Sequence, residues 1–386
     1  MITVVEKLLS ERFEGKVRLD AAEEIRSGGR SKVSRYRVLE RPRGAPKSII
    51  IKQVVAVGRE VYNPDSPDGP AWRLFNEWAG LQFLTENSGG ASPTPRFYAG
   101  DRDHGLLALE DLGSSKGLDH ALLGADPAYA EAMLVAFAAT LGRMHALTIG
   151  KQAEFERIRG GLGPRRNNAP DDGGKRLATL LRNMAQVVGV EPALGIDEEL
   201  RVVTRNLAEP GQFLAYLHHD PCPDNCLITD GGLKLIDFEF GGYGHALGDG
   251  IYGRIHFPTC WCVNRLPEYI PPKMEAAYRT ELIQGCPGSP EVVDDELFYR
   301  AVVEACAACV INSHNALTLL EDHRWGISTM RQRALLRFDI FWKMTEDYGH
   351  LKSVGATVRG IANKLRAQWP AEADAMPYYP AFRAQV

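Results

Sequence analysis

The chain lacks the long hydrophobic runs and the strong positive charge that characterise membrane-spanning and nucleic-acid-binding proteins. No apolar run reaches the roughly 18 residues that a membrane-spanning helix needs. The formal net charge is -4 over 386 residues, so no overall positive field favours a nucleic acid as partner. Glu6 and Lys7 interrupt the N-terminal segment too early for a secretory signal peptide. We therefore expect a cytoplasmic protein whose partners include neither a membrane nor a nucleic acid.

Cysteine is scarce as well, and its distribution argues against a secreted scaffold built on disulfides. The seven cysteines are odd in number and thinly spread. Cys306 and Cys309 fall in an Ala- and Val-rich helical run, where buried free thiols are common. Zinc binding stays an alternative, although two clean C-x2-C pairs with flanking turns are missing. The spacings that suggest it are Cys222-x3-Cys226, Cys260-x-Cys262 and Cys306-x2-Cys309.

The first part of the chain has the pattern of strands and turns. Residues 24–39 predict a hairpin around a Gly28-Gly29 turn, and residues 48–55 predict a buried strand. A loop rich in Pro, Asn and Asp follows, and then the spacing of apolar residues predicts a helix over about 71–86. Residues 106–109 predict another short buried strand.

Helical patterns dominate after residue 113, and strands followed by helices indicate an α+β fold. We expect an N-terminal lobe over residues 1–112 and a C-terminal lobe over residues 113–386. Short strands around a polar loop interrupt the helices between 213 and 240. The tail after Gln368 is interpreted as an extended strap or as a disordered end. The predicted helices cover about 127–148, 174–188, 196–207, 272–284, 293–320 and 328–350.

One segment of the C-terminal part brings three oxygen-bearing side chains into a pattern typical of catalysis. Asp220 and Asn225 lie five positions apart in a proline-containing loop, and a short hairpin with an Asp-Gly-Gly turn follows. The hairpin is expected to return Asp237 to the vicinity of Asn225. Three hard oxygen donors in one place suit magnesium.

Phosphoryl transfer needs this combination of groups. Metal ions neutralise the charge on the transferred phosphoryl oxygens, and a carboxylate accepts the proton of the attacking hydroxyl. The pattern therefore assigns Asp220 as the base and Asn225 with Asp237 as metal ligands. Each residue alone would be read as a turn or cap residue, and only the whole pattern indicates chemistry.

The same segment resembles the catalytic loop of the aminoglycoside phosphotransferases and choline-kinase-like enzymes. His218, Asp220 and Asn225 match the H-G-D-x-x-x-x-N motif, and Ile236-Asp-Phe-Glu239 matches the I-D-F/W-E motif that follows. The resemblance implies a two-lobed protein kinase-like fold, with a small β-rich N-lobe and a larger, mostly helical C-lobe. It adds His218 to the catalytic set and implies that Asp249 braces the loop. His219 departs from the family's glycine.

Candidates for a nucleotide site occur upstream in the order that the resemblance implies. The turn 27–32, with Ser31 and Lys32, is a candidate phosphate cradle, although a plain hairpin is the simpler reading. Lys52, at the end of a buried strand, is expected to grip phosphates and to pair with Glu77, for which Glu86 is a competitor. Leu109-Glu-Asp-Leu112 resembles the hinge, so Glu110 and Leu112 are expected beside adenine. His145 is expected in the core.

The leading hypothesis is a kinase that uses ATP and Mg2+ to phosphorylate a hydroxyl of a small molecule, aminoglycoside-, sugar- or antibiotic-like. A choline-like amine alcohol as acceptor and a nucleotide-binding pseudokinase are the alternatives. A protein acceptor is disfavoured because no A-P-E motif follows Asp237. Acidic residues of the C-terminal helices are read as an acceptor site or as a solvated face. The nucleotide preference, a monomeric or homodimeric state, and a role in resistance, self-protection or metabolism stay open.

Overall fold

The computed structural model describes residues 2–26, 30–55, 58, 61–90, 92–166, 173–314 and 319–385. They divide into two compact units. The first unit comprises Met1–Ser115, Lys151–Ala169 and Leu227–Gly242, and the second comprises Lys116–Gly150, Pro170–Cys226 and Tyr243–Val386. The first unit thus includes two segments that follow the boundary expected after residue 112.

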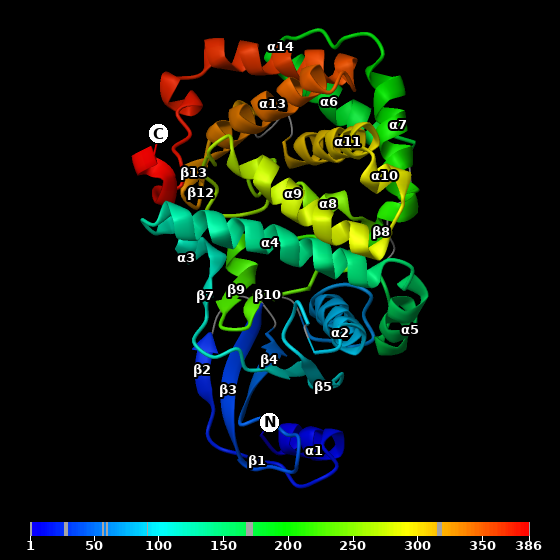
Figure 1. Ribbon diagram of the computed structural model, residues 1–386, viewed down its shortest axis with the longest axis vertical. Helices are drawn as coiled ribbons and strands as arrows, with labels where there is room; N and C mark the ends of the chain where they lie inside the picture. The colour runs from blue at the N-terminus through cyan, green and yellow to red at the C-terminus, as the bar shows by residue number, and fades with distance from the viewer. Residues whose placement is uncertain are drawn as a thin grey trace. The chain divides into compact units, whose positions relative to one another are not determined.

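An antiparallel sheet forms the centre of the first unit (Figure 1). Its strand order is β1-β3-β4-β6-β5, and β2 pairs with β3, as the predicted hairpin requires. Lys52 of β4 lies opposite Val33 of β3 and Leu107 of β6, so its position on the sheet is fixed from both sides. The strands are β1 (Arg18–Leu19), β2 (Glu23–Arg26), β3 (Ser31–Glu40), β4 (Ser48–Val54), β5 (Phe97–Asp101) and β6 (Leu106–Glu110).

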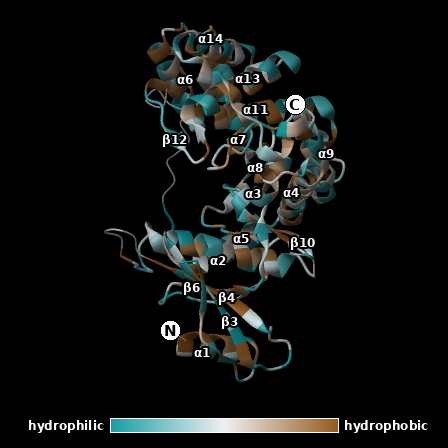
Figure 2. Ribbon diagram, turned by 90° about the vertical axis from the view of Figure 1, so that its left-hand side faces the viewer, coloured by the Kyte–Doolittle hydropathy of each residue, from teal (hydrophilic) through white to brown (hydrophobic). Residues whose placement is uncertain are grey.

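Helix α1 (Ile2–Arg12) packs on this sheet and was not expected from the sequence. Its Val5 and Leu9 are at most 1% exposed and share a core with Ile49 and Leu106 of the sheet. The hydrophobic colour of α1 and β4 in Figure 2 marks these two elements. The β-branched residues at the start of α1 favour strands, which concealed the helix in the sequence.

Helix α2 (Pro70–Asn87) confirms the helix predicted over 71–86, with Pro70 at its first turn. Helix α5 (Gln152–Leu162) packs beside it, where the rings of Phe83 and Phe155 meet edge to face at 5.9 Å. The predicted hairpin of the catalytic segment is also confirmed, as β9 (Cys226–Thr229) and β10 (Gly232–Leu235). The backbone of β10 is tied to the loop after α2 by a Leu235 N–H bond to Pro93 O at 2.8 Å.

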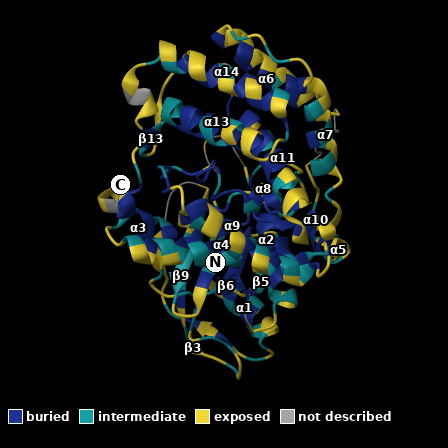
Figure 3. Ribbon diagram, turned by 45° about the horizontal axis from the view of Figure 1, so that its top comes forward, coloured by how far each residue is buried: buried dark blue, intermediate teal, exposed yellow. Residues whose placement is uncertain are grey.

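Helices dominate the second unit. Helix α4 is packed along α9, where Gly142 lets the two backbones approach: a Cβ there would lie 2.3 Å from Tyr278 O. Figure 3 shows buried and exposed residues alternating along α13 and α14. The helices are α3 (Leu118–Leu123), α4 (Pro127–Thr148), α6 (Lys175–Val188), α7 (Ile196–Ala208), α8 (Leu247–Gly250), α9 (Ile270–Leu282), α10 (Pro290–Val293), α11 (Asp295–Ser313), α13 (Met330–Asp347) and α14 (Lys352–Gln368).

One helix prediction for this unit is wrong, and one long helix was not predicted. The single helix predicted over 293–320 is broken after Val293, because Asp294 adopts an extended backbone and caps α11 by accepting from Leu297 N at 3.0 Å. Helix α14 was not predicted. Short strands complete the unit: β7 (Lys116–Gly117), β8 (Leu214–Leu217), which pairs with β11 (Gly242–His245), and β12 (Arg324–Trp325), which pairs with β13 (Ser328–Thr329).

The C-terminal tail packs as a strap as far as residue 385. Tyr379 and Phe382 are fully buried, and Arg265 forms an isolated bridge with Tyr378. The tail is therefore packed, as the strap interpretation requires, but it is not extended throughout: it includes two 3-10 helices, Ala371–Asp374 and Pro380–Gln385.

Across the described ranges, no single helix has both the length and the apolar composition to cross a membrane. Helices α4 and α5 pass such a test only as a bent pair, and then by length and composition alone.

Candidate active site

A pocket of about 280 Å3 lies entirely within the first unit. Its apolar walls come from the sheet, from α2 and from the β9–β10 hairpin. Its polar residues include Lys52, Glu77 and Asp237, and the segment Glu110–Gly113 follows β6 along its edge. A mostly apolar cleft with a few convergent polar groups is the usual form of a small-molecule or cofactor site. The apolar lining residues are Ile25, Val33, Ile50, Leu81, Pro95, Leu109, Leu227 and Ile236.

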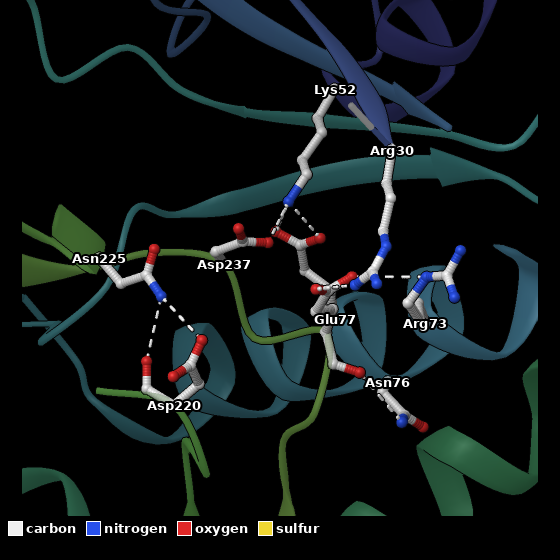
Figure 4. A network of polar contacts seen from close by, with 9 residues as sticks. Arg30, Lys52, Arg73, Asn76, Glu77, Asp220, Asn225 and Asp237 are labelled. Atoms are coloured by element: carbon white, nitrogen blue, oxygen red, sulfur yellow. Dashed lines mark hydrogen bonds and ion pairs between the residues drawn. The ribbon is translucent and has the colours of Figure 1, made fainter. Parts of the chain in front are cut away.

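Lys52 forms ion pairs with two carboxylates inside this pocket (Figure 4). Its Nζ lies 2.7 Å from Glu77 Oε2 and 2.6 Å from Asp237 Oδ1. The predicted pairing of Lys52 with Glu77 is thus confirmed, while Glu86 instead accepts a hydrogen bond from Gln82 at 2.8 Å on the exposed side of α2. The side chains of Lys52 and Glu77 are 16% and 4% exposed, so both charges are largely shielded from water.

Burial and the attraction between Lys52 and Glu77 shift the pKa values of both groups. Burial raises the pKa of Glu77 to about 7, although the ammonium of Lys52 opposes the shift. Burial would lower the pKa of Lys52, but the carboxylates of Glu77 and Asp237 outweigh it and raise that pKa above its ordinary value. Lys52 therefore stays protonated between these two carboxylates.

A second, adjoining pocket of about 270 Å3 is rich in arginine. Arg30 Nη1 lies 3.2 Å from Glu239 Oε1, and Arg73 Nε lies 3.5 Å from Glu239 Oε2. Asn76 Nδ2 donates to the carbonyl of Glu239 at 3.3 Å, so α2 also fixes the backbone that follows Asp237 (Figure 4). Sequence reasoning missed these residues, since single arginines and asparagines carry no motif.

The phosphate-cradle prediction is met only in part. Ser31 lines both pockets, whereas Lys32 is exposed and pairs with Glu24 at 2.8 Å. Residues 27–29 of the predicted glycine turn lie outside the described residues. Two cations that flank that turn, Arg26 and Arg30, line the second pocket, and Lys32 does not.

The segment predicted as a hinge is anchored by an arginine of β3. Glu110 and Leu112 line the larger pocket, and their place beside adenine stays a prediction. Arg35 donates to both carboxylate oxygens of Asp111, at 2.8 and 3.1 Å, and to Gly113 O at 3.0 Å. Burial would raise the pKa of Asp111, but its hydrogen bonds from Arg35 prevail and lower it. This clamp was not predicted, because Arg35 and Asp111 are far apart in the sequence.

The second unit holds the catalytic loop that contains Asp220 and Asn225. Asn225 Nδ2 donates to the backbone oxygen of Asp220 at 3.0 Å and lies 3.5 Å from its Oδ2 (Figure 4). Asp249, which is fully buried, accepts from the backbone N–H groups of His218 at 2.6 Å and His219 at 3.0 Å. The predicted bracing role of Asp249 is confirmed.

His218 and His145 are structural members of this loop's surroundings. His218 is fully buried, and its Nδ1 accepts from the backbone N–H of Asp220 at 3.3 Å. It therefore holds the loop rather than facing solvent. His145 of α4 lies in the core, as expected, with Nδ1 2.9 Å from Tyr278 Oη and Nε2 3.4 Å from Asp249.

Two residues of the catalytic segment have left-handed backbones. His219 has φ 63° and Asp237 has φ 69°. Non-glycine residues rarely adopt this region, and where they do they mark turns or functional sites. Glycine at the family's equivalent of position 219 would meet this requirement without strain, and His219 meets it with strain. The departure from the motif thus falls at a position whose backbone favours glycine.

A disulfide and a threonine also contact the loop, and neither was predicted. Cys222 is bonded to Cys260, 38 positions further on. Thr259 donates from its hydroxyl to Asp220 Oδ1. Trp261 Nε1 donates to Asp224 Oδ2 at 3.0 Å. The segment around residue 260 matched no motif, so nothing in the sequence marked it as a neighbour of Asp220.

The other cysteines are free and mostly buried, and burial raises the pKa of Cys262 to about 12. Within the part of the chain that the structure describes, no three His, Cys, Asp or Glu side chains assemble into a set that would hold a metal ion.

Residues 61–278 match the model of the phosphotransferase enzyme family, which is more than half of the chain. The chain belongs to this family. The matched stretch contains Glu77, Glu110, Asp220, Asn225 and Asp237, whereas Lys52 precedes it. The protein is therefore a kinase-like phosphotransferase, and the predicted α+β, protein kinase-like fold is confirmed. The comparison with curated proteins gives no match.

Several solved structures resemble the whole chain at low identity. A protein described as an aminoglycoside phosphotransferase from Ralstonia eutropha is 13% identical, with a TM-score of 0.46 over 94% of this chain and 96% of its own. A choline kinase from Cryptosporidium parvum is 12% identical, with a TM-score of 0.43 over 90% and 89%. A choline/ethanolamine kinase family protein from Mesorhizobium loti is 16% identical, with a TM-score of 0.42 over 88% and 92%. None of these likenesses carries an argument about the acceptor.

Proposed function

We propose that this phosphotransferase moves the γ-phosphate of ATP, with Mg2+, to a hydroxyl group of a small molecule. The observation that carries the proposal is Lys52, held between Glu77 and Asp237 in a pocket that the segment Glu110–Gly113 also lines. A buried cation beside an apolar cleft suits a nucleotide, whose base needs the cleft and whose phosphates need the charge.

In the first unit, the proposed roles follow from these contacts. Lys52 binds the α- and β-phosphates, and Glu77 keeps the ammonium aimed into the pocket. The backbone from Glu110 to Leu112 receives the adenine edge, and the Arg35–Asp111 clamp fixes that backbone. Ser31 faces the phosphates from β3.

In the second unit, Asp220 accepts the proton of the attacking hydroxyl, and His218 helps to hold its backbone. Asn225 donates its amide N–H to Asp220, so its carbonyl oxygen is the atom proposed to bind magnesium. In the first unit, the carboxylate of Asp237 is the other proposed ligand. One or two such oxygens plus substrate phosphates are the usual Mg2+ ligands, so this donor set fits the ion. Bound Mg2+ would neutralise the phosphate charge.

The acceptor is proposed to be a small hydroxylated molecule, and its charge stays unassigned. Acidic residues of the C-terminal helices were candidates for a cationic aminoglycoside. Several of them have structural partners: Asp294 caps α11, Asp295 pairs with Arg279, and Glu304 lies 2.8 Å from His350. These contacts favour structural roles for the acids. The proposed acceptor classes therefore stay aminoglycoside-, sugar- or antibiotic-like, with a choline-like alcohol as the alternative.

A regulatory pseudokinase is the second candidate function, and the charged groups disfavour it. A protein that only binds nucleotide has no need of both a base at Asp220 and ligands at Asn225 and Asp237. The full set is present in this chain.

An acceptor panel tests the proposal. The protein is incubated with ATP and Mg2+ and, in turn, with aminoglycosides, sugars, nucleoside antibiotics and choline-like alcohols. ADP release is measured, and acceptors are screened by mass spectrometry for one added phosphoryl group. We expect one class to stimulate ADP release and to gain phosphate. Tight ATP binding with no transfer to any acceptor and no hydrolysis would favour the pseudokinase.

A further inference from the structure

A short segment beside the catalytic loop is held in place by two buried arginines of α13. Arg337 Nη2 donates to Pro258 O at 3.0 Å, and Arg333 Nη1 donates to Cys260 O at 2.7 Å. The two arginines are at most 1% exposed. Buried guanidinium groups destabilise a protein unless they are hydrogen-bonded. Here, both guanidinium groups donate to the carbonyl oxygens of the residues on either side of Thr259. The backbone at Thr259 is therefore well fixed.

The side chain of Thr259 reaches Asp220 from this fixed backbone. Its hydroxyl donates to Asp220 Oδ1, the group proposed as the catalytic base. A second hydroxyl contacts it: Tyr252 Oη lies 3.2 Å from Thr259 Oγ1 and 3.2 Å from His219 O, and its single proton is donated to one of these two oxygens at a time. Tyr252 is 4% exposed, and burial raises its pKa well above the ordinary value, so it stays a neutral donor.

These contacts give each carboxylate oxygen of Asp220 a hydrogen-bonding neighbour. Oδ1 receives the Thr259 hydroxyl, and Oδ2 lies 3.5 Å from Asn225 Nδ2. A carboxylate held at both oxygens cannot rotate freely about its terminal bond. Catalytic groups lose large factors in rate when they are misplaced by about 1 Å.

We propose that Thr259 is a positioning residue that holds the carboxylate of Asp220 in its reactive orientation, with Tyr252 holding Thr259 in turn. The proposal rests on the proposed function, because it assigns a partner to the base of that reaction. The motifs quoted for the catalytic loop end at Glu239, 20 positions before Thr259. The residue contacts the base and acts through it.

Thr259→Val tests the role, because valine keeps the shape of threonine and removes the hydroxyl. Turnover of MgATP is measured as ADP release, with the best acceptor from the panel above or with water. We expect kcat to fall about tenfold, the cost of roughly one charge-assisted hydrogen bond, with KM for ATP unchanged. Thr259→Ser restores the hydroxyl and should recover most of kcat. Tyr252→Phe should lower kcat alone but add little to Thr259→Val.

Thr280→Val is the matched control, because Thr280 is another exposed threonine of the same unit, bonded only within α9 to Ala276 O. It should leave kcat unchanged. Wild-type kcat in Thr259→Val would overturn the positioning role. Equal losses in Thr259→Val and Thr259→Ser, accompanied by a lower melting temperature, would also overturn it and assign a structural role. If the unmodified enzyme releases no ADP with any acceptor or with water, the proposed function itself fails, and the role of Thr259 with it.

Discussion

His219 illustrates how a single backbone angle supports the catalytic loop. His219 has a φ of 63°, and its backbone N–H donates to Asp249 together with that of His218. Left-handed backbone costs a non-glycine residue about 1–2 kcal/mol, more for a β-branched residue. The loop therefore carries a histidine next to Asp220 at a position whose backbone favours glycine.

This conformation predicts different effects for two substitutions at position 219. His219→Gly should change the free energy of unfolding by less than about 1 kcal/mol, because relief of strain offsets the greater freedom of the unfolded chain. His219→Val should lower it by about 2 kcal/mol and reduce turnover, because a β-branched residue resists positive φ and shifts the loop. Urea unfolding and ADP release measure both. Equal stability of the two variants would contradict a left-handed residue at 219.

The sequence alone predicted those residues of the site that belong to recognisable motifs. Lys52, Glu77 and Asp237 were named from their order along the chain, and the structure joins them by ion pairs. Residues that act through long-range contacts carried no such signal. Arg35 reaches Asp111 across 76 positions, and Thr259 reaches Asp220 across 39. Only tertiary packing brings such pairs together, so no local pattern reveals them.

At the scale of elements, the Cys222–Cys260 disulfide joins the catalytic loop to the segment that carries Thr259. The link closes a loop across 38 positions. A cross-link of this span restricts the unfolded chain and stabilises the fold by about 4 kcal/mol in the chain-entropy model. It also limits how far Asp220 and Thr259 can separate.

The disulfide predicts a countable result with thiol reagents. In denaturant without reductant, five thiols should react, and after reduction all seven should react, because five cysteines are free and two are bonded. Reduction should also lower the free energy of unfolding by about 2–4 kcal/mol.

Cys222→Ser/Cys260→Ser is the matched control. It should have the lowered stability from the start and should not respond to reductant. Seven reactive thiols in unreduced protein, or equal responses of wild type and variant, would contradict the disulfide.

Sequence predicted the elements whose local pattern agrees with their packing. The range of α4 was predicted to the residue, since its apolar and alanine-rich pattern is uninterrupted. Helix α14 was missed because Gly355 and Gly360 weaken its helical signal. Gly355 is needed there: a Cβ would lie 1.9 Å from Thr345 Oγ1 of α13. The contact between α13 and α14 thus requires the residue that conceals the helix.

At the scale of the whole molecule, several buried histidines make stability depend on pH. Burial lowers the pKa of His245 to about 4 and that of His256 to about 3, and it lowers the pKa of His314 well below its ordinary value. In the unfolded chain these groups take up protons near pH 6.5. Their contribution to stability is therefore fully present above pH 6.5 and is lost as the pH falls toward the folded values.

Stability should accordingly fall steeply between pH 6.5 and 4. A depression of the size seen at His245 corresponds to roughly 3 kcal/mol. His245→Asn keeps a neutral acceptor for the backbone N–H of Leu247, which now donates to His245 Nδ1 at 3.3 Å. The variant should be less stable at pH 7.5, because the ring stacked on Phe213 is lost, but should lose less on acidification. Urea unfolding of wild type and variant at pH 7.5 and near pH 4 measures this difference in the loss of stability. Equal pH slopes for wild type and variant would contradict the assignment.

The account as a whole depends on Asp220 as the base for transfer from ATP. Asp220→Asn keeps the size of the side chain and still accepts from Thr259, but it cannot take up the proton. The most direct measurement is steady-state ADP release by this variant with saturating MgATP and acceptor. We predict that kcat falls by about 10²- to 10⁴-fold while ATP binding, measured by calorimetry, is retained. Wild-type turnover by Asp220→Asn would contradict the account.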